Sequence, residues 1–127
     1  MEYKIFRPDA ADELYTDERC HILELANSAE DDALSIARAR VEPHVTTALH
    51  RLEGTVERYV ILEGTGMVEI AGGAPERVAA GDVIVIPAGV SQRVTNSGDG
   101  DLVFLALCTP RFRPQSYVSL DGADAEI

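Results

Sequence analysis

Basic residues, cysteine, histidine and tryptophan are all scarce in this sequence. There are 11 Lys and Arg residues against 22 Asp and Glu residues, and the formal net charge is −11. A chain with this balance offers no basic patch for a phosphate backbone or for an anionic membrane surface, so we expect neither a nucleic-acid partner nor a membrane partner. Several acidic residues gather near the start, and we interpret them as solvated surface: Asp9, Asp12, Glu13, Asp17 and Glu18.

Long apolar runs and paired cysteines are also missing. The longest apolar stretches, at 83–86 and 102–108, are far too short to cross a bilayer, and the first ten residues lack the apolar run of a signal peptide. Cys20 and Cys108 have neither zinc-type spacing nor the pattern of a disulfide framework. We therefore expect a cytoplasmic protein in which both thiols are small buried side chains.

Short β-rich runs separated by turn signals make up most of the chain, whose 127 residues fit one domain. We expect an N-terminal arm over 1–20, in which 8–19 could hold a short helix, a β-barrel over 21–120 and an acidic tail over 121–127. The predicted strands are 22–26, 34–41, 46–52, 56–62, 67–71, 76–79, 83–86, 92–95, 102–109 and 116–120. So many short strands predict an all-β fold that closes into a barrel or sandwich, which can hold one ligand inside.

Two of these strands carry a histidine and a carboxylate whose strand faces can be assigned from the alternation of side chains. His50 and Leu52 share one face of the strand 46–52, and Glu57 and Tyr59 share one face of the strand 56–62. Only residues 53–55 join the two strands, and if these strands pair as a hairpin, His50 and Glu57 can lie near each other on one surface. Such a pair can bind a divalent metal or act as an acid and a base.

The stretch GDVIVIPAGVSQRVTN resembles the second sequence motif of the cupin superfamily. Gly81, Pro87, Gly89 and Asn96 stand in register with that motif, and Gln92 occupies the place of its histidine. The stretch HRLEGTVERYVILEG is similar to the first motif.

In that first motif, His50 matches the first histidine, Glu57 the glutamate and Gly64 the glycine, whereas Leu52 stands where a second histidine belongs. The resemblance covers roughly residues 34–110.

The resemblance implies a single-domain jelly-roll barrel, a homodimer and one divalent metal ion held by His50, Glu57 and Gln92. These nitrogen and oxygen ligands favour iron or manganese, with zinc, nickel or copper as further possibilities. Our first hypothesis is an enzyme of dioxygenase, isomerase or lyase type that acts on a small polar metabolite. Glu57 and His50 would be its catalytic residues, and Leu52 and Tyr59 would shape the pocket.

The alternative is a metal-free cupin that binds or senses a small ligand, and the changes at Leu52 and Gln92 favour it. Arg38 and Arg40 share one face of their strand. We favour an outward orientation for both, whereas an inward one would let them bind a carboxylate or a phosphate.

Overall fold

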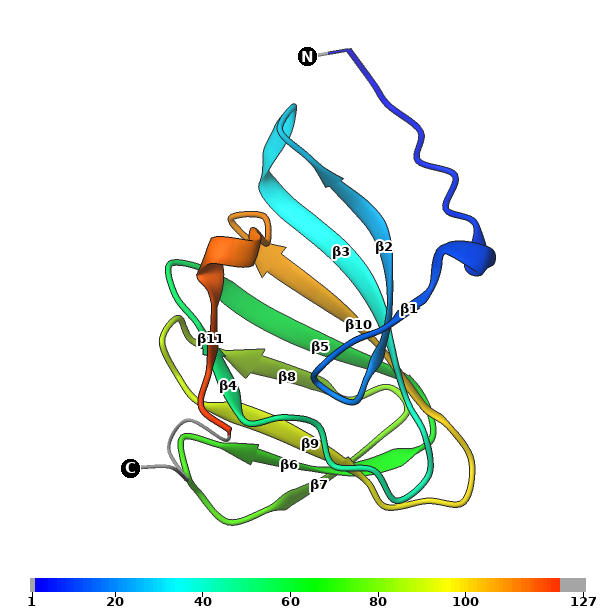
Figure 1. Ribbon diagram of the computed structural model, residues 1–127, viewed down its shortest axis with the longest axis vertical. Helices are drawn as coiled ribbons and strands as arrows, with labels where there is room; N and C mark the ends of the chain where they lie inside the picture. Colours follow the sequence, from blue (N-terminus) through cyan, green and yellow to red (C-terminus); the bar gives the residue numbers. More distant parts are fainter. Residues whose placement is uncertain (1, 122–127) are drawn as a thin grey trace.

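A computed structural model describes residues 2–121 as two antiparallel β-sheets packed face to face (Figure 1). The first sheet has the strand order β1 (Leu14–Tyr15), β2 (His21–Ser28), β3 (Asp31–Val41), β10 (Leu102–Thr109), β5 (Val56–Glu63), β8 (Val83–Ile86). The second has the order β11 (Tyr117–Ser119), β4 (His50–Leu52), β9 (Gln92–Asn96), β6 (Thr65–Ile70), β7 (Glu76–Ala79). Two 3-10 turns, Ala10–Asp12 and Pro114–Ser116, complete the secondary structure of these residues. The all-β jelly-roll expected from the sequence is confirmed.

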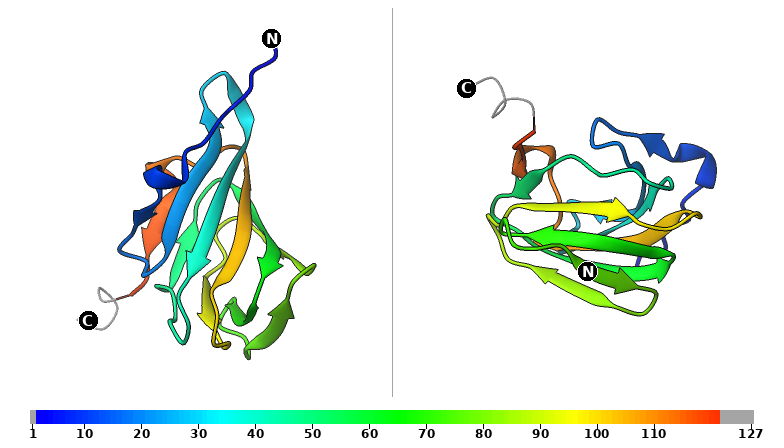
Figure 2. Two further views of the ribbon diagram at one scale, coloured as in Figure 1. Left: turned by 90° about the vertical axis from the view of Figure 1, so that its right-hand side faces the viewer. Right: turned by 90° about the horizontal axis from the view of Figure 1, so that it is seen from below.

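The core lies between the two sheets and follows the alternation of the strands. Tyr59 and Ile61 of β5 are buried, as are Val94 of β9 and Phe104 of β10, whereas their sequence neighbours face outward. Figure 2 shows both layers edge-on and the N-terminal segment running beside β2. The apolar contacts between the layers fix which side chains of β4, β5 and β9 point inward.

The strands that carry His50 and Glu57 do not pair as a hairpin. Strand β4 starts only at His50, and of the residues before it Thr46 forms an isolated bridge with Thr95. Strand β4 pairs with β9 and β11, whereas β5 pairs with β10 and β8 in the other sheet. Gly54 lies in the connection that crosses between the sheets and has a φ of 76°, a left-handed conformation that glycine adopts without steric strain. His50 and Glu57 therefore approach each other across the interior, not along a hairpin.

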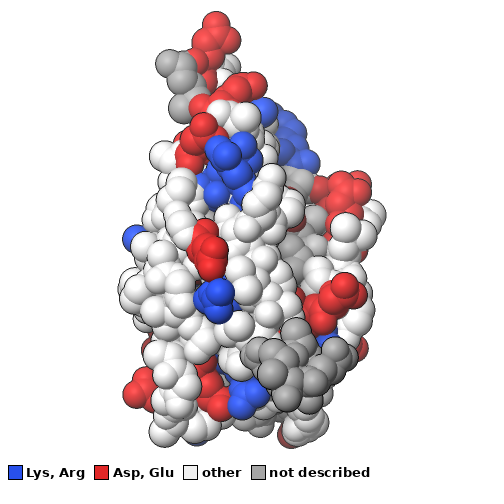
Figure 3. Space-filling view, turned by 60° about the vertical axis from the view of Figure 1, so that its left-hand side comes forward, with Lys and Arg blue, Asp and Glu red and all other residues white. Residues whose placement is uncertain are grey.

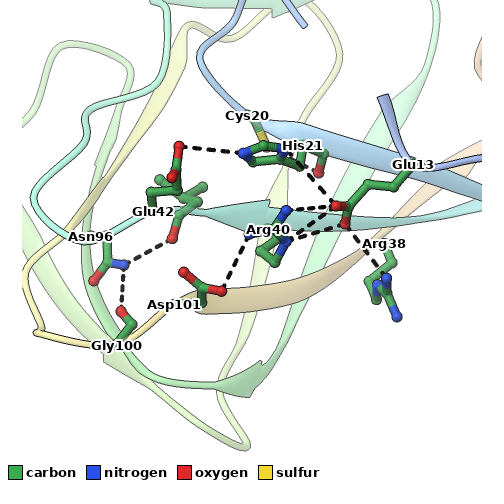
Figure 4. Close-up of polar contacts among 10 residues, drawn as sticks. Glu13, Cys20, His21, Arg38, Arg40, Glu42, Asn96, Gly100 and Asp101 are labelled. Atoms are coloured by element: carbon green, nitrogen blue, oxygen red, sulfur yellow. Dashed lines mark hydrogen bonds and ion pairs between the residues drawn. The ribbon is translucent and has the colours of Figure 1, made fainter. Parts of the chain in front are cut away.

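The N-terminal segment adds to the first sheet, because β1 pairs with β2. Just before β1, Glu13 forms ion pairs with Arg40 at 2.6 Å and with Arg38 at 3.5 Å, and Arg40 also reaches Asp101 (Figure 4). These contacts place both arginines on the outer face of β3, as favoured from the sequence. They also correct the interpretation of Glu13 as freely solvated, since it is a partner for two cations.

Charged side chains form small separate groups on the face shown in Figure 3, and uncharged residues cover most of that face. Between residues 2 and 121 no helix has the length and hydropathy needed to span a membrane. The acidic tail expected over 121–127 lies, apart from Asp121, outside the described residues. Asp121 itself forms an ion pair with Arg19 at 3.1 Å.

Asn96 closes the end of the sandwich at which β9 leaves the second sheet. Its side chain is fully buried, and its amide donates to the carbonyl oxygens of Val41 and Gly100 at 2.9 and 2.8 Å (Figure 4). Its carbonyl oxygen accepts from the backbone N–H of Gly98. One side chain thus satisfies three backbone groups, one at the end of β3 and two in the connection between β9 and β10, which explains an asparagine at this motif position.

We predict that Asn96→Ala lowers the free energy of unfolding by about 2–3 kcal/mol, because it leaves buried backbone groups without partners. Urea unfolding monitored by circular dichroism measures the loss. The exposed neighbour Ser97 supplies a control, since Ser97→Ala removes no hydrogen bond seen among the described residues. An Asn96→Ala protein as stable as Ser97→Ala would contradict this role of Asn96.

Candidate functional site

A cavity of about 190 Å³ opens between the two sheets. Side chains of β2, β3, β10 and β5, all strands of the first sheet, line it on one side. His50 and Leu52 of β4 line it from the second sheet, and the turn before β2 adds Glu18. The residues that line it include Glu18, His50, Leu52, Glu57, Tyr59 and Phe104. This volume is below that of pockets for drug-sized ligands, so the cavity suits a small molecule with an apolar body and a polar head.

His50 presents one ring nitrogen to this cavity. Its Nδ1–H donates to the backbone carbonyl of Ala48 at 3.0 Å, and its ring stacks on Tyr117 with centroids 4.9 Å apart. A carbonyl oxygen can only accept, so Nδ1 carries the proton and Nε2 keeps a lone pair in the neutral imidazole. The side chain is 4% exposed and held in a single orientation. It can therefore accept a proton at Nε2.

Glu57 approaches the cavity from the opposite sheet. Its Oε2 accepts a weak hydrogen bond from the Cys108 thiol at 3.7 Å, whereas its buried Oε1 has no partner in the described part of the chain. Burial raises the pKa of Glu57, and attraction to His50 and the nearby Gln92 amide oppose this only in part. The carboxyl group is thus suited to carry a proton on Oε1.

Gln92 pairs with His50 in the register of β4 and β9 but is not among the residues that line the cavity. Its side-chain oxygen accepts a hydrogen bond from the Tyr59 hydroxyl, and its buried Nε2 has no partner of hydrogen-bond geometry within residues 2–121. The free group that Gln92 offers is therefore an N–H donor. Metal ions bind lone pairs, so this orientation does not suit a ligand.

Tyr59 and Leu52 both line the cavity, as expected for pocket residues. Tyr59 packs against Phe104 with ring centroids 4.5 Å apart, and burial raises the pKa of its hydroxyl well above the usual value. The Tyr59 hydroxyl therefore stays protonated and serves to orient Gln92. Burial likewise raises the pKa of Cys20 and of Cys108 to about 12, which keeps both thiols unreactive.

Glu18 is a site residue that the sequence interpretation missed. It lies in the turn 16–20, where the Thr16 hydroxyl donates to the carbonyl of Cys20. Its own carbonyl accepts from the N–H of Ala48, and the Arg19 guanidinium donates to the carbonyl of Thr46. These hydrogen bonds hold the turn against the loop before β4. In this position Glu18 lines the cavity.

Burial raises the pKa of Glu18, and attraction to His50 opposes the shift. Glu18 is half-buried and lines the cavity, so its interpretation as freely solvated surface is wrong. No sequence pattern distinguishes Glu18 from its neighbour Asp17, because side chains in a turn do not alternate as they do in a strand. Only the packing of the turn against the loop before β4 directs Glu18 inward.

Of the three metal ligands expected from the resemblance, His50 and Glu57 line the cavity and Gln92 does not. Leu52 offers no lone pair, and the oxygen of Gln92 is engaged by Tyr59. Across the described residues, no three His, Cys, Asp or Glu side chains form a group that could hold a metal ion. The structure thus brings His50 and Glu57 to one cavity, while Gln92 lies behind its wall.

A two-sheet jelly roll with an enclosed cavity defines the class of protein, and the comparison of its sequence with known families agrees. Residues 37–108 match the Cupin domain family. Those residues include both motifs and the strands β4, β5 and β9 that carry His50, Glu57 and Gln92. This chain belongs to the cupin family.

One sequence relative and two solved structures are similar to this chain. The oxalate-binding protein of Thermotoga maritima is 34% identical over 90 residues, which are 71% of this chain and 73% of that protein. KdgF from Halomonas sp. is 17% identical with a TM-score of 0.75, and the match covers 90% of this chain and 98% of that one. A variant of Streptomyces PAC13, solved with uridine, is 13% identical with a TM-score of 0.75 and 92% coverage of each chain. The last two likenesses establish the fold.

We predict that Glu57→Gln gains stability relative to the native protein as the pH rises. In the folded state the pKa of Glu57 is raised above 4.5, its ordinary value in an unfolded chain. At pH values above 4.5 the folded protein therefore binds more protons than the unfolded chain. The native carboxyl contributes fully below pH 4.5, and its contribution falls as the pH rises through the raised pKa. Glutamine does not titrate, so the difference in Tm between variant and native protein should grow from pH 5 to pH 8.

Glu63→Gln is the matched control, since Glu63 is an exposed residue of the same strand. Thermal unfolding at a series of pH values measures both variants. A difference for Glu57→Gln that is independent of pH, as for Glu63→Gln, would disprove the raised pKa.

Proposed function

We propose that this protein is an acid–base cupin that moves a proton on a small metabolite bound between its two sheets. The observation that supports this proposal is the unpartnered, buried Glu57 Oε1 on the same small cavity as His50. A buried polar atom without a partner costs free energy, which a ligand group can recover by hydrogen bonding to it. Two titratable groups in different environments are typical of an acid and base pair.

The roles follow from the atoms that each residue leaves free. His50 Nε2 takes a proton from a carbon or oxygen of the ligand, because Nδ1 is already committed to the Ala48 carbonyl. Glu57 gives a proton from Oε1 to the ligand oxygen that gains charge, and its Oε2 stays with Cys108. Leu52 and Tyr59 shape the pocket and exclude water. This exchange serves an isomerisation or a lyase-type elimination.

Proton exchange with solvent tests the proposal across many compounds at once. The protein is incubated in D2O with a library of small carbonyl and hydroxyl metabolites, and mass spectrometry detects deuterium at carbon. We predict exchange for at least one compound and a loss of about 100-fold or more in His50→Gln and in Glu57→Gln, the contribution expected of positioned acid–base groups.

His44→Gln serves as the control, since His44 lies in an exposed turn and contacts only Asp99 among charged groups of residues 2–121. Its exchange rate should equal that of the native protein. Exchange that survives in His50→Gln, or no exchange for any compound, would disprove catalysis by this pair. The second outcome would favour the alternative of a ligand-binding or sensing cupin.

A metal-dependent enzyme is the other candidate, and the family resemblance favours it. His50 and Glu57 would then hold iron, manganese or another divalent ion with only partial support from Gln92. We predict substoichiometric metal by elemental analysis of the purified protein, and unchanged thermal stability after treatment with a chelator. Stoichiometric metal that disappears in both His50→Ala and Glu57→Ala would establish the metalloenzyme instead.

The homodimer and the cytoplasmic location expected from the sequence stay predictions. Val83 and Val85 on the edge strand β8 are each 59% exposed, which is consistent with an apolar surface available to a second copy. Sedimentation equilibrium of the purified protein measures the assembly directly.

A further inference from the structure

The cavity is acidic at its polar end. Within residues 2–121 its lining includes Glu18, Glu24 and Glu57, and His50 is its single ionisable nitrogen, since none of these lining residues is Lys or Arg. The arginines of β3 are held on the outside by Glu13. An anionic ligand such as a dicarboxylate would therefore meet carboxyl groups without a fixed cation to balance it.

Glu18 is a half-buried carboxyl group at the edge of this lining. In the described range 2–121 its carboxylate makes no hydrogen bond and no ion pair, and burial rather than a neighbour dominates its environment. The next residue, Arg19, cannot neutralise it, because the guanidinium is bound to the Thr46 carbonyl and to Asp121. Two carboxyl groups from different segments thus line one small cavity. Within residues 2–121, neither the Glu18 carboxylate nor Oε1 of Glu57 has a hydrogen-bond partner.

We infer that the ligand carries a protonated amine, which binds to the Glu18 carboxylate, and an apolar body, which packs against the wall formed by β3 and β10. The wall side chains include Ile36, Ala37, Phe104 and Ala106. A cationic N–H donor gives Glu18 the strong charge-assisted hydrogen bond that the protein itself does not supply. This inference rests on the proposed function only in sharing its cavity, since Glu18 recognises the ligand and His50 and Glu57 transfer the proton.

The size of the cavity limits the apolar body to about one ring. A dry protein cavity of about 150 Å³ accepts benzene, so about 190 Å³ has room for a ring with one short polar head. Benzylamine, benzyl alcohol and benzoate are therefore suitable probes, because they share the ring and differ in the charge of the head group.

Isothermal titration of the full-length protein at pH 7 with each probe tests the inference. We expect benzylamine to bind at least about tenfold more tightly than benzyl alcohol, and benzoate to bind most weakly, because a hydrogen bond between charged groups adds about tenfold or more in affinity. In Glu18→Gln the preference for the amine should disappear, whereas affinity for the alcohol should change little.

Asp17→Asn is the matched control: it removes one negative charge from the adjacent, exposed position and should keep the preference for the amine. An amine that binds no more tightly than the alcohol, a preference that survives in Glu18→Gln, or no binding of any probe would overturn the inference. The comparison of the three probes on the native protein tests the inference even if a variant does not fold. The titration measures affinity alone, so it does not test the proposed function. Failure of the proposed function would instead be seen as deuterium exchange that persists in His50→Gln.

Discussion

Burial of the Glu57 carboxyl group between two apolar layers is the constraint on which the site depends. A carboxylate at this depth loses hydration, and the surrounding groups restore only part of it: a weak thiol donor from Cys108, the nearby Gln92 amide and attraction to His50. The result is an acid with a raised pKa and one free oxygen. The arrangement of β4, β5 and β9 serves to hold that oxygen opposite an oriented imidazole.

The charges of the molecule are divided between its outside and its inside. On the outer face of β3, Arg38 and Arg40 share Glu13, and the carboxylate and the guanidinium of Arg40 each stabilise the charged form of the other. The inner face of the same strand presents Ala37 and Ala39 to the cavity. Alternation along one strand thus keeps these two cations out of the cavity.

Two substitutions distinguish this cupin from the pattern it resembles, and their effects are linked. Leu52 removes a nitrogen ligand and adds apolar surface, while Gln92 replaces another with an amide that the Tyr59 hydroxyl holds by its oxygen. A donor set with fewer lone pairs suits proton transfer between organic groups better than tight metal binding. In the proposed function His50 and Glu57 have the roles that need only a proton, and Glu18 adds a carboxylate from outside the motif region.

The sequence by itself determined the all-β fold, the family and which residues share a strand face, because alternation, turn residues and motif spacing are local properties of the chain. Which of the two faces of each strand is buried was decided by the packing of the two sheets. Only the tertiary structure decided that β4 and β5 lie in opposite sheets, since a three-residue connection can close a hairpin or cross a sandwich. It also decided that Gln92 bonds Tyr59 and that the turn bearing Glu18 docks on the cavity. Those outcomes depend on contacts between segments distant in sequence, which no local pattern encodes.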